Sequence, residues 1–405
     1  MRVATANSYD NTISQLNKRQ AELSKLQSSI STGKRVQRAS DDPVAAVMSE
    51  AAQNRLARVQ ADQRSLTTSR TSLTQAESAL GNAGGILQDV RDLMVSAGNG
   101  TYSPKEYKDI ASQMEGMRDQ LLAVANQKDS AGRTLFGGLG GTSSPFVETF
   151  GAAGRSVQFE GMRGQEATGN TTLPQSFDGN AVFMRVPPGN GSFTVELGAG
   201  NTGSVHTDPG QVSDPSAVTG QAYSIAFSGA SGSMQYSVTN TTTGLPVAGQ
   251  TAQPYNEGSA IAFDGVSFAV SGKPANGDTL VLAPNSDSTD IFAVLQKTID
   301  TLRSASSSGS PAVLQTLGRT MTELDAGHDR VLQARSLAGA WLNRADATES
   351  LLADRAVAHK AEQSSLEDLD MVQGISDFQN QQTGLQAALQ SYAQVQRLSL
   401  FQYIG

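Results

Sequence analysis

Apolar side chains recur at alternating steps of three and four residues near both ends of the chain, with polar residues between them. The first stripe runs from Tyr9 to Ile30 and the second from Phe378 to Tyr392. A seven-residue apolar repeat predicts a coiled-coil seam rather than the face of a globular core. We therefore expect the two ends of the chain to pack against each other or against other copies, with the middle looping out between them. The expected contact positions are Tyr9, Ile13, Leu16, Leu23, Ile30, Phe378, Leu385, Leu389 and Tyr392, with Gln20, Gln27 and Gln382 in the same stripes.

The last residues of the chain are also apolar. Chain ends are usually polar and frayed, so an apolar end indicates a surface that binds a partner. The residues expected to contribute are Leu398, Leu400, Phe401 and Tyr403, beside Ile404.

A long helix is predicted to follow the N-terminal stripe. The first helix should end at Gly33, since a glycine just past the last periodic residue commonly terminates a helix. Asp42 can cap the next helix, and Pro43 fits its first turn. The apolar positions continue to about Ala97, so the helix would be roughly 80 Å long at 1.5 Å per residue. The predicted stripe is Val44, Val47, Ala51, Leu56, Val59, Leu66, Leu73, Leu80 and Leu87.

The remaining sequence predicts one further N-terminal helix, then strands, then helices again. Ser103 to Glu106 has the form of a capping box before a helix that ends by about residue 132. Apolar and polar residues alternate between about residues 141 and 287, which is typical of short strands. The helical period returns at about Ser288 and continues, with a break near Ser304–Ser310, to about Leu398. The predicted fold is therefore α+β and multidomain: a discontinuous, coiled-coil-like helical rod built from both ends of the chain, with an inserted all-β domain.

Composition agrees with a protein that packs helices between chains. Only 38% of the 405 residues are hydrophobic and 5% are aromatic, which is thin material for globular cores. The net charge of −8 argues against nucleic-acid binding. Residues 1–40 carry seven basic and two acidic side chains, whereas residues 361–405 carry five acidic and one basic. This asymmetry favours pairing of the two ends, although two solvated helix faces would explain it equally well.

The sequence carries weak signals for chemistry. It has no cysteine, which excludes disulfides and cysteine-ligated metals. Neither an apolar signal core nor a stretch of about 18 apolar residues is present, so we expect no cleaved signal and no membrane span. Ser31 to Lys34 matches only one of the serine β-lactamase motifs, and His359 with Glu362 would be half of a di-iron site at most. We therefore expect no catalytic, metal or cofactor site, and no enzyme activity.

Four segments resemble the bacterial flagellin family. Ile30–Ala46 is similar to its N-terminal signature, and the Asp-Asp-Pro-Val-Ala-Ala form within it is similar to the member that lies between hook and filament. Met1-Arg2-Val3 with Thr5 and Tyr9 resembles the opening of that member. Gly132–Gly138 and Leu398–Ile404 resemble its glycine-rich segment and its ending.

The resemblance implies a structural subunit of the flagellum, exported through the flagellar type III apparatus to the cell exterior. A ring of copies would lie between the first hook-associated protein on the hook side and flagellin on the filament side. A flagellar export chaperone would hold the C-terminal helix before export. Residues 1–40 with 365–405 would form paired helices of an inner tube, residues 41–140 with 288–364 a helical rod domain, and residues 141–287 an outer β domain.

Two other interpretations stay open from the sequence. The chain could be filament flagellin itself, which polymerises alone. It could also be an adhesin that carries a glycan-binding β domain on a helical stalk.

Overall fold

The structure is a computed structural model that describes residues 2–99, 101–140, 143–151, 154–164, 167–168, 173–230, 232–285 and 287–404. For residues 2–9, 167–168 and 395–404 only the backbone is described. The chain forms two compact units: unit 1 comprises Met1–Ser65 and Ala347–Gly405, and unit 2 comprises Leu66–Asp346. The helices are α1 (Arg2–Thr32), α2 (Pro43–Ala97), α3 (Pro104–Ala125), α4 (Gly179–Phe183), α5 (Ile291–Ser304), α6 (Pro311–Glu367) and α7 (Met371–Ile404).

The predicted helix ends are confirmed, and each has a local cause. Gly33 adopts a φ of +70°, the left-handed conformation that ends α1. The Ala45 N–H donates to Asp42 Oδ1 at 3.0 Å, which caps α2. Ser103 and Glu106 form both hydrogen bonds of a capping box at the start of α3.

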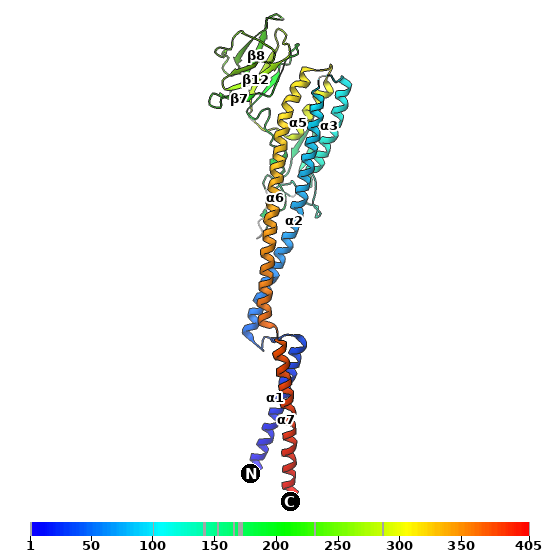
Figure 1. Ribbon diagram of the computed structural model, residues 1–405, viewed down its shortest axis with the longest axis vertical. Coiled ribbons are helices and arrows are strands. Elements are labelled where there is room, and N and C mark those ends of the chain that lie inside the picture. Colours follow the sequence, from blue (N-terminus) through cyan, green and yellow to red (C-terminus); the bar gives the residue numbers. More distant parts are fainter. Residues whose placement is uncertain are drawn as a thin grey trace. The chain divides into compact units, whose positions relative to one another are not determined.

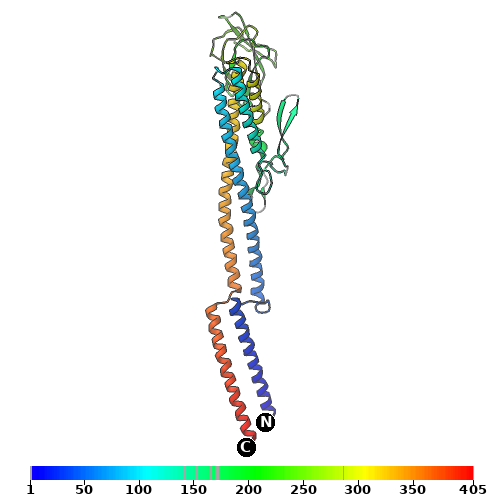
Figure 2. The same cartoon turned by 90° about the vertical axis from the view of Figure 1, so that its right-hand side faces the viewer.

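In unit 2 the helices α2, α3, α5 and α6 lie side by side (Figure 1, Figure 2). Buried residues follow a seven-residue repeat on the two long helices, as in a coiled coil. Ion pairs join Arg91 to Asp325 at 2.8 Å and Glu77 to Arg335 at 2.7 Å, so α2 and α6 run antiparallel. The repeat within unit 2 is Leu66, Leu73, Leu80, Leu87 and Met94 on α2, and Leu317, Leu324, Val331, Ala338 and Ala345 on α6.

The prediction of which residues face the core is wrong at the start of α2. Val44 and Val47 are 64% and 68% exposed, whereas Ala45 and Ala52 are buried. The seven-residue repeat that starts at Ala45 continues to Val59. The spacing of large apolar residues concealed this face because its first two members are alanines, which contribute little to an apolar pattern.

The strands form one separate β core and two small attachments. The five-stranded sheet has the order β10-β9-β8-β13-β5, and the smaller sheet has the order β11-β12-β6 with β7 paired to β12. Inward-facing residues from both sheets, such as Ile225 and Phe268, make up their shared core. The strands of this core are β5 (Phe193–Leu197), β6 (His206–Thr207), β7 (Gln211–Val212), β8 (Tyr223–Ser228), β9 (Gln235–Asn240), β10 (Gln253–Pro254), β11 (Ala260–Phe263), β12 (Val266–Ser271) and β13 (Thr279–Pro284).

The first part of the β region packs on the helices instead of on this β core. The elements that pack there are the hairpin β1 (Phe146–Gly151) and β2 (Gly154–Phe159) and helix α4, and the pair β3 (Ala167–Thr168) and β4 (Leu173–Pro174) lies between them in the sequence. Phe146 is buried in the helical core, with ring centroids 5.5 Å from Phe183 and 6.0 Å from Phe292. The buried Arg118 of α3 donates to Glu148 Oε1 at 2.8 Å, which anchors the hairpin.

Gln315 of α6 joins the separate β core to the helices of unit 2. Its side-chain amide donates to the Val195 carbonyl oxygen at 2.8 Å and accepts from the Thr207 N–H at 2.7 Å. All three residues are buried. Because a buried backbone group without a partner is costly, this glutamine is worth more here than an average surface contact.

Candidate assembly interface

The residues that matched parts of catalytic or metal-binding motifs make ordinary surface contacts. Lys34 is paired with Glu367, 2.8 Å away, and lacks the partners of a catalytic lysine. His359 Nδ1 lies 3.4 Å from Glu362 Oε2, but the same carboxylate already accepts from Arg55 at 3.2 Å. Within the residues that the structure describes, no group of three or more His, Asp or Glu side chains could hold a metal ion.

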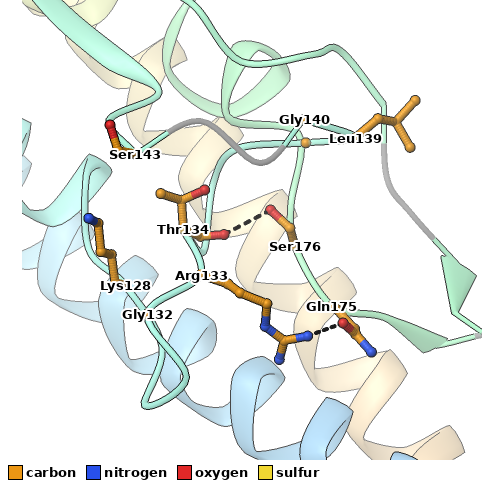
Figure 3. A pocket seen from close by; sticks show the side chains of 10 residues that line it. Lys128, Gly132, Arg133, Thr134, Leu139, Gly140, Ser143, Gln175 and Ser176 are labelled. Atoms are coloured by element: carbon orange, nitrogen blue, oxygen red, sulfur yellow. Dashed lines mark hydrogen bonds between the residues drawn. The ribbon is translucent and has the colours of Figure 1, made fainter.

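A pocket of 330 Å³ lies beside the glycine-rich segment that follows α3. Figure 3 shows the Ser176 hydroxyl pointing to the Thr134 carbonyl oxygen, 3.1 Å away, and Arg133 pointing to Gln175. Arg133 is also paired with Asp129 at 2.8 Å. The Arg133 guanidinium and the Ser176 hydroxyl are thus engaged within the protein, and the lining brings no general base next to a serine. The pocket is explained as part of the packing around this segment.

The glycine-rich segment is needed for close packing rather than for chemistry. Gly138 has a φ of +68°, and a Cβ there would collide with the Met162 carbonyl oxygen. Leu135 and Phe136 just before it are fully buried in the helical core. The segment therefore holds the chain against the helices where the helical region gives way to strands.

The terminal helices α1 and α7 pack side by side as an antiparallel pair (Figure 2). Gln381 of α7 donates to Glu22 of α1 at 3.4 Å, and the Leu369 N–H donates to the Gly33 carbonyl oxygen at 2.9 Å. The predicted meeting of the two ends is therefore confirmed. The predicted positions that are half-buried along this pair are Leu16, Leu23, Ile30, Phe378, Leu385 and Tyr392.

Two predicted contact positions remain open to solvent. Ile13 is 44% exposed and Leu389 is 50% exposed. Among the residues of α1 and α7 whose side chains are described, no apolar side chain is fully buried. The pair therefore leaves part of its apolar surface uncovered within one chain. Tyr9, Leu398, Leu400, Phe401 and Tyr403 lie outside the residues whose side chains are described.

A polar clasp fixes the top of this pair, where both terminal helices connect to the rest of unit 1. We define the clasp as Lys34, Arg35, Ser49 and Glu367. The Glu367 carboxylate accepts from Lys34 Nζ at 2.8 Å and from the Ser49 hydroxyl. The Arg35 N–H donates to the Glu367 carbonyl oxygen at 2.7 Å, and its guanidinium donates to the Leu366 carbonyl oxygen at 2.8 Å.

The clasp shifts the protonation equilibria of its charged pair. The hydrogen bond from Lys34, then that from Ser49, lowers the pKa of Glu367 below its ordinary value. The same hydrogen bond raises the pKa of Lys34. The sequence did not predict the clasp, because its partners are 333 residues apart. The basic run after Gly33 and the acidic run at Glu367–Asp370 were the signals that could have indicated it.

Comparison with known proteins relates both helical ends of the chain and its β core to bacterial flagellar proteins. Residues 3–140 match the model of the bacterial flagellin N-terminal helical region, and residues 321–404 match that of the bacterial flagellin C-terminal helical region. Residues 198–284, which contain most of the separate β core, match the D2-like domain of flagellar hook-associated protein 1.

Individual relatives match over different lengths. Flagellar hook-associated protein 3 of Escherichia coli K12 is 27% identical over 409 residues, covering 99% of each chain. The crystal structure of flagellar hook-associated protein-3 from Legionella pneumophila is 28% identical, with a TM-score of 0.69, and covers 78% of this chain and 98% of that chain. Polar flagellin F of Vibrio parahaemolyticus is 28% identical over 131 residues, which is 32% of this chain. The described helices include none long and apolar enough to cross a membrane.

Proposed function

Because the chain belongs to the bacterial flagellin family, we propose that it is a structural subunit at the junction between the hook and the filament of the bacterial flagellum. The proposal rests on the fraction of the chain that each relative matches. Hook-associated protein 3 of Escherichia coli matches 99% of this chain, whereas polar flagellin F matches 32%. Filament flagellin is therefore not favoured.

The similarity of the β core disfavours the adhesin interpretation. Residues 198–284 match a domain of another flagellar hook-associated protein. A β domain of this kind already belongs to structural flagellar proteins, so no glycan ligand is required to explain it. The role is mechanical and structural rather than catalytic.

Assembly completes the surface that the single chain leaves uncovered. Ile13, Leu389 and the half-buried stripes of α1 and α7 form the assembly interface, extended by the apolar C-terminal residues. A helix pair with so little buried apolar surface gains little to offset the entropy lost on ordering. Ordering of α1 and α7 is therefore coupled to contact with neighbouring subunits.

The partners follow from the position at the junction. Other copies complete a ring, the first hook-associated protein contacts it on the hook side, and flagellin contacts it on the filament side. An export chaperone covers the C-terminal helix before the chain leaves the cell, and the working location is the extracellular flagellum. No nucleic acid, membrane or cofactor takes part.

Each domain has a different place in the proposed assembly. Residues 1–40 with 365–405 form the inner tube, residues 41–140 with 288–364 form the surrounding helical domain, and residues 141–287 form the outer region. Within that outer region, the hairpin of β1 and β2 is packed on the helices and stiffens them. The separate β core carries the outward surface.

The test is deletion of the gene, followed by electron microscopy and analysis of the medium. Cells without the protein should keep their hooks and release flagellin in soluble form, and the wild-type gene should restore filaments. Filaments that stay attached in the deletion strain would exclude the junction role. Filaments that fail because flagellin is no longer made would indicate filament flagellin instead.

A further inference from the structure

The separate β core and the helices of unit 2 have different hydrophobic cores. Among the described residues, no apolar side chain belongs to both clusters of buried residues. A cavity of about 190 Å³ lies at the contact between them, and its lining includes Glu196, Lys297, Thr316 and Arg319. Burial of apolar surface is the dominant favourable term when most protein surfaces associate. The β core therefore depends on polar contacts to stay on the helices.

Polar side chains at successive turns of α6 make these contacts. The Gln315 amide donates to the Val195 carbonyl oxygen and accepts from the Thr207 N–H, both in the β core. One turn later, Arg319 donates to Glu196 Oε1 at 2.6 Å. Residues four apart on an α-helix lie on the same face. This face of α6 therefore meets the β core with hydrogen-bonding groups.

Glu323, a further turn along α6, holds the segment that leads into the β core. Its Oε1 accepts from the Gly189 N–H at 2.7 Å and from Arg319 Nε at 2.6 Å. Glu323 is 2% exposed, so loss of either contact would leave a buried carboxylate short of a partner. Lys297 of α5 adds an ion pair with Glu196 at 3.1 Å. Arg319 is thus shared between a buried carboxylate of α6 and a carboxylate of the β core.

Gln315 lies against the edges of both sheets. β5 is an edge strand of the five-stranded sheet, and β6 is an edge strand of the smaller sheet. Because the Gln315 amide donates to β5 and accepts from β6, it takes the place of a peptide group of a further strand. An unpaired strand edge is a template for another chain. Contact with α6 therefore shields these two edges and also fixes the orientation of the β core.

The chain crosses between the helices and the β core twice, along one path. Val186 and Thr289 exchange two backbone hydrogen bonds of 2.8 Å, and the Asn285 N–H donates to the Ser192 carbonyl oxygen at 3.1 Å. The two crossings therefore lie side by side. A body on such a paired connection can turn about it while its own core stays intact.

We propose that Gln315, Arg319 and Glu323 form a latch between α6 and the β core, and that the β core moves away from α6 as one body when the latch opens. The three contacts act together, because a movement of the β core that breaks one of them breaks the others. This inference goes beyond the proposed function and does not depend on it.

The experiment follows hydrogen exchange of two amides in the purified full-length chain. The Thr207 N–H donates to Gln315 and the Gly189 N–H donates to Glu323, so each reports on one end of the latch. The paired strands β8 and β13 report on the β core itself. Mass spectrometry after timed deuterium labelling resolves the peptides that contain these residues.

Each end of the latch is broken in turn, and the amide at the other end is measured. Gln315→Leu should speed exchange of Gly189 by at least roughly tenfold, although Glu323 is unchanged. Glu323→Ala should speed exchange of Thr207 by a similar factor. Gln333→Leu, at an exposed glutamine further along α6, is the matched control and should change neither amide. β8 and β13 should exchange as in the wild type in all three variants.

Glu196→Gln tests the latch without a change to a buried group. Glu196 is exposed, so the variant should fold even if a change at Gln315 or Glu323 prevents folding. The substitution removes the carboxylate that Arg319 and Lys297 bind. It should speed exchange of both reporter amides by roughly threefold, although it contacts neither of them.

Three results would overturn the proposal. If each substitution speeds only the amide that it contacts, the contacts are independent and form no latch. If β8 and β13 lose protection together with the reporter amides, the β core unfolds instead of moving as one body. Unchanged exchange of both reporter amides in Glu196→Gln would likewise exclude the latch. The junction role is tested separately by the deletion strain, so it stands or falls on other data.

Discussion

The α2/α6 pair of unit 2 and the α1/α7 pair of unit 1 share one sequence pattern but differ in how it is satisfied. Both are antiparallel and both carry apolar residues at seven-residue spacing. On α2, Leu73, Leu80 and Leu87 are each at most 1% exposed. On α7, the seam residues Leu385 and Tyr392 are only half-buried, and Leu389 beside them is 50% exposed. An apolar repeat therefore predicts that a helix face packs against another surface. It does not predict whether that surface belongs to the same chain or to another.

The difference has a simple geometric cause. In unit 2, α3, α5 and the first part of the β region pack against α2 and α6, so buried residues of all these elements share one core. In unit 1, α1 packs against α7, and two helices can cover only the line along which they touch. The uncovered flanks are the surface that we assign to assembly.

Hydrogen exchange should show the largest difference between the two pairs. In the purified full-length chain, amides of α2 within unit 2 should exchange only on global unfolding. Amides of α1 and α7 should open at a cost that is several kcal/mol lower. Mass spectrometry after timed deuterium labelling measures both. Equal protection of the two pairs would contradict the coupling of order to assembly.

Leu80→Ala should strongly destabilise unit 2. Leu80 is 0% exposed in the seam of α2, and truncation of such a leucine costs about 2–5 kcal/mol. Urea unfolding of the variant measures the loss. Leu337→Ala is the matched control, since Leu337 is 42% exposed and should change the free energy of unfolding by less than about 0.5 kcal/mol. Similar losses for both variants would show that the seam does not hold unit 2 together.

Protonation of Glu367 in acid should weaken the clasp and destabilise unit 1. The loss should be smaller than the loss that Leu80→Ala causes in unit 2. The folded-state pKa of Glu367 is lowered, so its contribution is present above the ordinary pKa of 4.5 and is lost as pH falls through the folded value. The Lys34 side chain is 49% exposed, so screening limits the ion pair to less than about 1 kcal/mol. The pKa of Lys34 is raised, so its contribution is present below 10.5 and is lost above the folded value.

Glu367→Gln provides the measurement of this effect. Protection of the α1/α7 amides should be higher in the wild type than in the variant at neutral pH, and the difference should shrink as the solution is acidified. Exchange rates must be corrected for their intrinsic pH dependence. A difference that grows on acidification would mean that the carboxylate is destabilising in the folded chain.

Leu389→Asp should have the smallest effect on the free chain and a large effect on assembly. Because Leu389 is half exposed, we expect the free energy of unfolding to change by less than about 0.5 kcal/mol. A charge in the assembled seam would be desolvated, so filament attachment should be lost. Urea unfolding and motility are measured together. Wild-type motility of this variant would remove Leu389 from the interface.

The sequence by itself determined the elements and their ends, because these depend on neighbours a few residues apart. Gly33, Asp42 and the Ser103–Glu106 box act within one turn of backbone. The alternation of apolar residues likewise predicted β5, β8 and β12, since side chains of a strand point to opposite faces in turn. The pairing of α1 with α7 also followed from their stripes, although its register did not.

Only the tertiary structure decided which residues meet across long separations. The buried face of α2 starts at Ala45 rather than at Val44, and the hairpin of β1 and β2 belongs to the helical core. Glu367 finds Lys34 across 333 residues. These features depend on the register between distant segments, and register is fixed by the packing of whole surfaces rather than by the preferences of single residues.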